Sequence, residues 1–292
     1  MGAPSEIFSR IIQREPDSHK GNYGHSLVLA GSCRYTGAPY FTVQGALLSG
    51  CGLVTLGIGR SLYPIMASKL NEAMIWPLFE TQDLSLSILS EREIIRRSEN
   101  VDVFAAGPGM STNKETQQLV KNLILKTKKP FVVDADGITA LSTYPDTLKK
   151  AEAPIVITPH PGEMSRLSRK SIGEIEDNRE AAARDFAKEN RCTVVLKGSG
   201  TIVASHTGEM YVNDTGNPGM ATGGTGDILT GMIAGLMCQG LDAHSASVLG
   251  VYAHGLAGDI AVKEKGALSL LATDILNYIP AAFCSVARSV LA

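Results

Sequence analysis

Residues 101–158 have the sequence VDVFAAGPGMSTNKETQQLVKNLILKTKKPFVVDADGITALSTYPDTLKKAEAPIVIT, and this stretch decides the fold class. Three apolar runs in it, Val101–Gly107, Pro130–Ala135 and Pro154–Thr158, are short, continuous and rich in β-branched residues. Such runs are typical of strands that are buried on both faces of a parallel sheet. A helical pattern over Lys114–Lys126 connects the first two runs, as in a βαβ unit. The stretch therefore predicts an α/β fold.

The same alternation continues on both sides of this stretch. Further strand-like runs are Ser26–Gly31, Leu53–Ile58 and Thr193–Gly198, and further helical patterns are Pro39–Gly50 and Asp177–Asn190. Together they predict a doubly wound three-layer α/β/α sandwich with a mostly parallel central sheet. The chain contains no linker, no low-complexity segment and no repeat of 20–50 residues, so a single domain over residues 1–292 is favoured over two.

The last third of the chain departs from this rhythm. Thr201–Asn213 predicts a hairpin that turns at His206-Thr207-Gly208, which adds an antiparallel piece at one side of the sheet. From Gly226 onward the pattern is mainly helical. Small residues in that region suit close helix packing; they are Gly231, Ala234 and Gly235.

Composition and charge exclude several classes of protein. A hydrophobic content of 44% and a charged content of 19% describe a globular chain. The net charge of −2 gives no broad basic field, so neither nucleic acid nor an anionic membrane is an expected partner. The five scattered cysteines lack C-x-x-C spacing and fit a reducing compartment. Without a signal-like segment or an apolar run of membrane-spanning length, a cytoplasmic location is expected.

The densest candidate site is NDTGNPGMATGGTGDILTG, residues 213–231. Gly223, Gly224, Thr225 and Gly226 lie at the start of an apolar helical pattern, where small residues let backbone N–H groups converge and leave room for a phosphate. The first turn of a helix has unpaired N–H donors and a partial positive charge, so the loop predicts an anion hole. The alternative is a tight turn before an ordinary helix. The loop is neither a Walker A motif nor a GxGxxG fingerprint.

Asp227 directly follows this loop. A carboxylate beside a bound phosphoryl group can accept the proton of an attacking hydroxyl. The alternative is a first-turn carboxylate that only stabilises the helix. Because the helix dipole lowers the basicity of such a group, we expect position, more than a raised pKa, to make Asp227 a base.

Four other loops follow predicted strands, where ligands of open α/β sheets bind. Gly107-Pro108-Gly109 permits close approach of a ligand to the backbone or forms a plain turn. Asp134 and Asp136 are site carboxylates or belong to a solvated turn or helix cap. His160 lies between two prolines and is as readily structural. Lys197 ends an apolar run and either meets a phosphate or extends to solvent.

These segments together resemble the ADP/ATP-dependent NAD(P)H-hydrate dehydratase family, whose fold is ribokinase-like. The matching strings extend from His19 to about Leu236 and are, in order, HKGNYGHSLVLAGS, YTGAPYFTVQGALLSGCGLVTL, AAGPGMS, VVDADGITAL, ITPHPGEMSRL, VVLKGSGT and NPGMATGGTGDILTGMIAGL. The last string is highly specific, and the order of the others adds weight. The resemblance implies repair of the S-forms of NADHX and NADPHX, the hydrated forms of NADH and NADPH. ADP or ATP phosphorylates the C6 hydroxyl, and phosphate then eliminates.

The resemblance also implies roles for individual residues. Asp227 would be the catalytic base and contact the hydrate, which Ala38, Gly109 and His160 would also bind. The adenine nucleotide (AMP or ADP) would bind Lys197, Gly198, Ser199, Gly200, Thr201 and Gly226, beside Gly223, Gly224 and Thr225 of the predicted anion hole. Mg²⁺ would bridge the phosphates, although no protein ligand for it is evident in the sequence.

Further expectations concern the type of enzyme. The string NPGMATGGTGD is more similar to the ADP-using branch, and the resemblance implies a homotetramer. Because the first motif begins at His19, an N-terminal epimerase domain is expected to be absent and a separate NAD(P)HX epimerase to be a functional partner. A small-molecule kinase of the same fold, of the thiazole or hydroxymethylpyrimidine type, shares the glycine-rich helix start followed by Asp. A non-catalytic nucleotide-binding protein is the remaining alternative.

Overall fold

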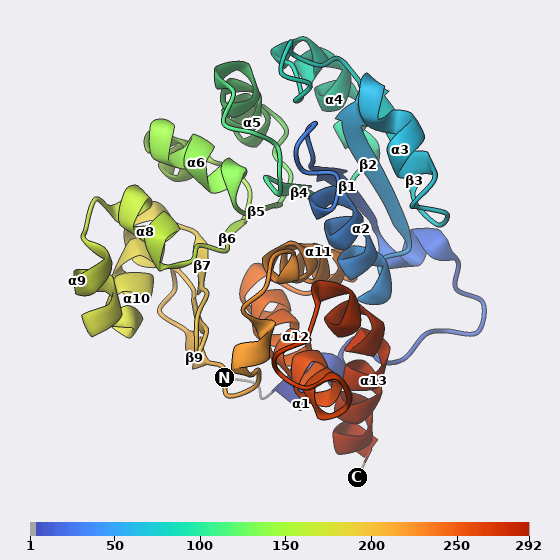
Figure 1. The fold of residues 1–292 in the computed structure, drawn as a ribbon, viewed down its shortest axis with the longest axis vertical. Helices are drawn as coiled ribbons and strands as arrows, with labels where there is room; N and C mark the ends of the chain where they lie inside the picture. Colours follow the sequence, from blue (N-terminus) through green and yellow to red (C-terminus); the bar gives the residue numbers. More distant parts are fainter. Residues whose placement is uncertain (1–3, 292) are drawn as a thin grey trace.

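The computed structural model describes residues 4–291, in which nine strands form one sheet with the order β3-β2-β1-β4-β5-β6-β7-β8-β9 (Figure 1). The strands are β1 (His25–Leu29), β2 (Leu53–Gly59), β3 (Met74–Leu78), β4 (Val103–Ala106), β5 (Phe131–Val133), β6 (Ile155–Ile157), β7 (Thr193–Leu196), β8 (Ile202–Ala204) and β9 (Met210–Val212). Neighbours from β3 to β7 pair in parallel, whereas β7–β8 and β8–β9 are antiparallel. The predicted mostly parallel sheet with a hairpin at one side is confirmed.

Helices cover both faces of this sheet. The α-helices are α1 (Pro4–Ser9), α2 (Ala38–Leu48), α3 (Tyr63–Ala67), α4 (Glu91–Arg97), α5 (Lys114–Lys126), α6 (Asp136–Thr143), α7 (Asp146–Lys150), α8 (Pro161–Ser168), α9 (Ile172–Asp177), α10 (Arg179–Asn190), α11 (Thr225–Cys238), α12 (Ala243–Lys265) and α13 (Ala272–Leu291). The short 3₁₀ helices are η1 (Lys20–Tyr23), η2 (Arg60–Leu62), η3 (Ile88–Ser90), η4 (Ser98–Asn100) and η5 (Pro218–Met220). In Figure 1, α5, α6 and α8 lie on one side of the sheet and α2, α11 and α13 on the other. None of the helices within the described residues is long and apolar enough to span a bilayer.

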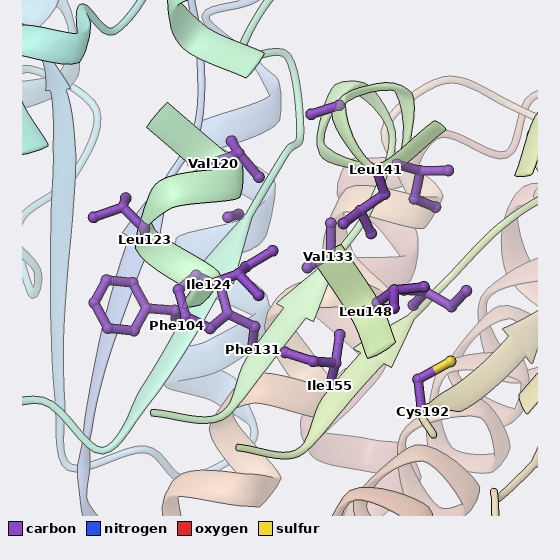
Figure 2. Close-up of a cluster of buried hydrophobic side chains, with 14 of the residues drawn as sticks. Phe104, Val120, Leu123, Ile124, Phe131, Val133, Leu141, Leu148, Ile155 and Cys192 are labelled. Atoms are coloured by element: carbon purple, nitrogen blue, oxygen red, sulfur yellow. The ribbon is translucent and has the colours of Figure 1, made fainter. Parts of the chain in front are cut away.

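Alternate residues of the central strands fill two separate cores. Leu27 and Phe104 point into the core beneath α5 and α6, whereas Val28 and Ala105 point into the core beneath α2 and α11. Figure 2 shows the first core, in which the rings of Phe104 and Phe131 stack with their centroids 4.5 Å apart. Each fully buried Phe side chain contributes ~1.5–3 kcal/mol through burial. The continuous apolar runs predicted as strands therefore reflect a sheet that is covered on both faces.

The sequence-based prediction missed several short helices, among them α4 and α6, and it differed from the structure in one strand and one helix start. Strand β3 was not predicted, because its sequence MIWPL contains Pro77. Within residues 4–291, β3 pairs only with β2 and so lies at an edge of the sheet. An edge strand tolerates a proline, because a position that faces away from the neighbouring strand needs no N–H donor. The helix expected over Asp177–Asn190 begins at Arg179, because Asn178 separates α9 from α10 and caps the latter.

Two glycines place helix α11 directly on α2. A Cβ atom at Gly231 would lie 2.0 Å from the carbonyl oxygen of Thr42, and one at Gly235 would lie 2.5 Å from that of Ala46. Any larger residue at these positions would force the helices apart. The predicted close packing is therefore confirmed, and it fixes the position of the helix that begins at Thr225.

Candidate active site

The start of α11 lies against the end of β5. The hydroxyl of Thr230 donates a hydrogen bond to Asp134 Oδ2 over 3.0 Å, and Asp134 follows the last residue of β5. A Cβ atom at Gly226 would lie 3.3 Å from Lys197 Nζ and 3.7 Å from Asp134 Oδ2. The first turn of α11, which carries Asp227, thus meets residues that follow strands β5 and β7.

Lys197 is the cation of this site. Its Nζ donates a hydrogen bond to Asp134 Oδ1 over 2.6 Å and lies 3.9 Å from Glu163 Oε2. The lysine side chain is 19% exposed, and that of Asp134 is 2% exposed. Burial alone would lower the pKa of Lys197, but the charges of Asp134, Glu163 and Asp227 raise it above its ordinary value. Of the two interpretations of Lys197, extension to solvent is therefore wrong.

The carboxyl group of Asp227 is less acidic than that of an ordinary aspartate. Burial, followed by the negative charge of Asp134, raises its pKa to about 7, against the opposing charge of Lys197. Asp136 raises this pKa further. No hydrogen bond from residues 4–291 stabilises the ionised carboxylate. The expectation that Asp227 would rely on position more than on a raised pKa was wrong, because burial beside another carboxylate outweighs the helix dipole. A group of this pKa can accept a proton at neutral pH.

Asp136 is the third carboxylate at this edge of the sheet. Its Oδ2 accepts a hydrogen bond of 2.8 Å from the backbone N–H of Ser111, in the loop after β4. Burial raises the pKa of Asp136, as does the charge of Asp134, while the Ser111 bond opposes the change. Ala135, between the two acids, has φ 49° and ψ −117°, which a residue with a side chain rarely adopts. A solvated turn is excluded for Asp134, which is buried.

A cavity of about 680 Å³ lies beside these groups. One wall brings together most of the residues expected to bind the nucleotide, namely Lys197, Gly198, Ser199, Gly200, Thr201, Thr225 and Gly226. The other walls come from the segment before α11 and from α12, including Asn213, Asn217, Met220 and His254. The volume lies within the range of small-molecule sites.

The remaining two glycines of the predicted anion hole differ from each other. Gly223 and Gly224 are absent from the lining of this cavity. Gly224 has φ 97°, and a Cβ atom there would lie 2.7 Å from the ring of Phe41. The space beside Gly224 is therefore filled by protein and offers no room for a phosphate. At Gly223, apart from the residue itself and its two chain neighbours, no described atom lies within 4 Å of the corresponding Cβ position.

The residues expected to bind the hydrate come partly together. A Cβ atom at Gly109 would lie 2.6 Å from Tyr35 Cβ and 3.1 Å from Ala38 Cβ, so Gly109 and Ala38 are neighbours. A Cβ atom at Gly107 would lie 1.8 Å from the carbonyl oxygen of Asp134. Gly109 thus lets the loop after β4 pack against the start of α2, and Gly107 lets it pack against the residue after β5. These two contacts fix the position of the loop after β4.

His160 is the N-cap of α8. Its Nδ1 accepts hydrogen bonds from the backbone N–H groups of Gly162, at 3.0 Å, and Glu163, at 3.3 Å. The Glu163 carboxylate in turn accepts from the N–H of His160 at 2.9 Å, which completes a capping box. Since Nδ1 is an acceptor, Nε2 carries the proton of the neutral ring. The ring is 51% exposed, and its Nε2 lies 3.4 Å from Glu163 Oε1.

Sequence reasoning assigned no role to three residues that organise the site. These residues are Ser111, Glu163 and Thr230. For Thr230 a signal exists, because it lies three residues after Asp227 and so shares its helix face. The contacts of Ser111 and Glu163 join segments distant in sequence, and no local pattern indicates them. Among residues 4–291 no cluster of three or more His, Cys, Asp or Glu is arranged to hold a metal ion.

The model of the family described as NAD(P)H-hydrate dehydratase matches residues 26–281. The ADP-dependent (S)-NAD(P)H-hydrate dehydratase of Bacillus subtilis is 35% identical over 94% of this chain and 94% of its own length. The chain belongs to the NAD(P)H-hydrate dehydratase family. The bifunctional NAD(P)H-hydrate repair enzyme of Moorella thermoacetica is 43% identical over 93% of this chain, but the match spans only 51% of that relative. The chain thus covers about half the length of its bifunctional relatives.

Solved structures agree with membership of the dehydratase family. The crystal structure of the ADP/ATP-dependent NAD(P)H-hydrate dehydratase of Bacillus subtilis, co-crystallised with ATP and Mg²⁺, superposes with a TM-score of 0.82 and 31% identity, over 97% of each chain. The hydroxyethylthiazole kinase of Pyrococcus horikoshii has a TM-score of 0.63 at 15% identity, which shows a shared fold alone. The predicted ribokinase-like fold is confirmed.

Proposed function

We propose that this protein dehydrates the S-forms of NADHX and NADPHX to NADH and NADPH, with ADP as the phosphoryl donor and AMP and phosphate as by-products. One observation supports this reaction above all others. The carboxylate of Asp227 lies at a helix start beside the Lys197–Asp134 pair, and the preceding Gly226 lines a cavity together with Lys197–Thr201. A base, a cation and free backbone N–H groups are the elements that phosphoryl transfer to a hydroxyl requires.

The nucleotide would occupy the cavity with its phosphates toward Gly226. Lys197 supplies positive charge there, and the N–H groups at the start of α11 supply donors for phosphate oxygens. Gly223, Gly224 and Thr225 would support this anion site through the backbone. A Mg²⁺ ion would arrive with the phosphates, which agrees with its usual coordination by phosphate oxygens and water. Among the described residues no cluster of His, Cys, Asp or Glu side chains is arranged to bind this ion.

Asp227 would act as the base in the first step. The hydroxyl oxygen at C6 of the hydrate forms a bond to the terminal phosphorus of ADP, the bond from that phosphorus to AMP breaks, and the hydroxyl proton moves to Asp227. The pKa of about 7 leaves a large ionised fraction at neutral pH. Lys197 offsets the negative charge that remains near Asp134.

The hydrate would bind where Ala38 and Gly109 adjoin, with the exposed ring of His160 as a further contact. Gly109 belongs to the same loop as Ser111, which donates a hydrogen bond to Asp136, so this subsite and the carboxylates share one edge of the sheet.

We further propose that residues 1–292 form one domain and that the protein is a homotetramer located in the cytoplasm. A separate epimerase would supply the S-form of the hydrate.

The direct test uses purified protein, enzymatically hydrated NADH, Mg²⁺ and either ADP or ATP. The proposed function predicts that the absorbance band of reduced nicotinamide returns, that AMP and phosphate form in equal amounts, and that ADP supports a higher rate than ATP. Phosphorylation of a thiazole or hydroxymethylpyrimidine alcohol, without return of that band, would instead support a small-molecule kinase. Nucleotide binding without turnover of either substrate would indicate a non-catalytic protein.

A further inference from the structure

Dehydration of the hydrate requires a second proton acceptor, and this requirement rests on the proposed function. Removal of water takes the hydroxyl from C6 and a hydrogen from the adjacent ring carbon. The first step transfers the hydroxyl proton to Asp227. The second step breaks the C–H bond of the adjacent carbon, and Asp227 is then already protonated. Some other group must accept this proton, either a carboxylate of the site or the departing phosphate itself.

Three other carboxylates of the site, Asp134, Asp136 and Glu163, are candidates, and hydrogen bonds or Lys197 already engage two of them. Asp134 accepts from Lys197 through Oδ1 and from Thr230 through Oδ2, and it is buried. Glu163 is 5% exposed, accepts from the backbone of His160, and lies 3.9 Å from Lys197. Both carboxylates lie near Lys197 and accept hydrogen bonds from other protein groups, so they are poorly placed to meet a substrate.

Asp136 differs from these two acids. The backbone N–H of Ser111 donates a hydrogen bond to Asp136 Oδ2. Within residues 4–291 no group donates a hydrogen bond to Asp136 Oδ1. Asp136 is only partly buried, unlike Asp134 and Glu163. It lies on the first turn of α6, after the strained Ala135, and its negative charge adds to the charges that raise the pKa of Asp227. The Ser111 bond ties it to the loop that contains Gly109.

We propose that Asp136 is a second catalytic base, which accepts the proton from the ring carbon adjacent to C6 while phosphate departs. The electrons of that C–H bond form the C5–C6 double bond of the product, and the C6–O bond breaks. Asp227 returns the hydroxyl proton to the departing oxygen, so the phosphate leaves as a hydrogen phosphate dianion and Asp227 is ionised again. Asp136 then releases its proton to solvent. ADP and the hydrate thus give AMP, hydrogen phosphate, the dihydronicotinamide and one proton.

Asp136→Asn tests this assignment, because Asn retains an acceptor for the Ser111 N–H but cannot accept a proton. Rapid-quench measurements follow AMP, which reports phosphoryl transfer, and absorbance follows the dihydronicotinamide. The variant should form AMP in its first turnover at a rate within about threefold of the parent, whereas the absorbance should return about 10²–10⁴-fold more slowly. A phosphorylated hydrate should accumulate and be visible by ³¹P NMR. Asp146→Asn is the matched control, because Asp146 is a first-turn acid of the next helix and is exposed.

A hydrate prepared in D₂O, which carries deuterium on the carbon adjacent to C6, adds an independent measurement. The isotope effect should appear on the absorbance phase, increase in Asp136→Asn, and be absent from AMP formation. Asp136→Ser provides the same comparison if the Asn variant does not fold. Parental absorbance rates in a folded variant would overturn the assignment in favour of the phosphate as proton acceptor, and equal slowing of AMP and absorbance would overturn it in favour of a role in the first step. Absence of AMP formation in the parent would instead refute the proposed function.

Discussion

The hydroxyl of Thr230 hydrogen-bonds Asp134, and this contact joins the helix that carries Asp227 to the end of β5. Asp134 in turn accepts the hydrogen bond from Lys197, so one buried carboxylate contacts both the helix that carries Asp227 and the cation of the site. Both oxygens of Asp134 have partners, which explains how a charge can be stable at 1% exposure. The position of Asp227 therefore depends on contacts made one turn further along α11.

Thr230→Val should destabilise the protein. Valine has nearly the same shape, but it removes the donor to a buried carboxylate, so we expect the free energy of unfolding to fall by about 1–3 kcal/mol. Urea denaturation followed by circular dichroism measures this change. Thr230→Ser keeps the hydroxyl and should lose less than half as much. Equal losses in the two variants would show that packing, and not the hydrogen bond, explains the effect.

The raised pKa of Asp227 should make stability depend on pH. The folded pKa of about 7 lies above the ordinary value of 3.8, so the folded state binds the proton more tightly than the unfolded state. The free energy of unfolding should therefore decrease as pH rises between these values, by at most about 1.4 kcal/mol per pH unit. Asp227→Asn lacks this dependence. Its stability relative to the parent should increase from pH 4 to pH 7 and then level off; a constant difference across that range would contradict the raised pKa.

Removal of Lys197 should leave Asp134 unpaired in a buried position. Lys197→Met should lower the free energy of unfolding at pH 8 by about 3–5 kcal/mol, the usual cost of one isolated buried charge. Adding Asp134→Asn should recover part of that loss, because the uncompensated charge is gone. ADP affinity should be weak in both variants, since the phosphates lose a cation. If the double variant loses as much free energy of unfolding as the two single variants together, measured by chemical denaturation, the Lys197–Asp134 pair contributes no coupling energy.

Gly226 offers a test of the nucleotide site that leaves the helix packing intact. A methyl group there would lie 3.3 Å from Lys197 Nζ, so Gly226→Ala should displace the lysine and reduce ADP affinity by about tenfold, measured by calorimetry. Gly173→Ala is the matched control. Gly173 is likewise the second residue of a helix, and its nearest neighbour to an added Cβ, Ser171 Oγ, lies 4.0 Å away. Unchanged ADP affinity in Gly226→Ala would place the phosphates elsewhere.

The sequence predicts the fold of this protein more completely than its site. Continuous apolar runs such as Val101–Gly107 indicate strands because burial on both faces demands apolar side chains along their whole length. Strand β3 was missed because Pro77 is unfavourable in every strand except one at an edge, and the sequence does not reveal which strand is at the edge.

The acidity of Asp227 and the surroundings of Gly224 were not predictable from local patterns. The charge of Asp134, 93 positions earlier in the chain, helps to raise the pKa of Asp227, and Phe41 fills the space beside Gly224. Both effects arise from tertiary contacts. The motif drew attention to these residues, whereas the fold determines how acidic and how accessible they are.

Asp227→Asn tests the central claim most directly, because asparagine preserves the shape of the side chain but cannot accept a proton. Two quantities are measured on the same folded protein: the dissociation constant of ADP, and the rate at which the absorbance of reduced nicotinamide returns from hydrated NADH. We predict that ADP affinity persists or rises slightly, because a negative charge near the phosphates is gone, and that the rate falls by about 10²–10⁴-fold. A folded variant that restores NADH at close to the parental rate would contradict the assignment of Asp227 as the base.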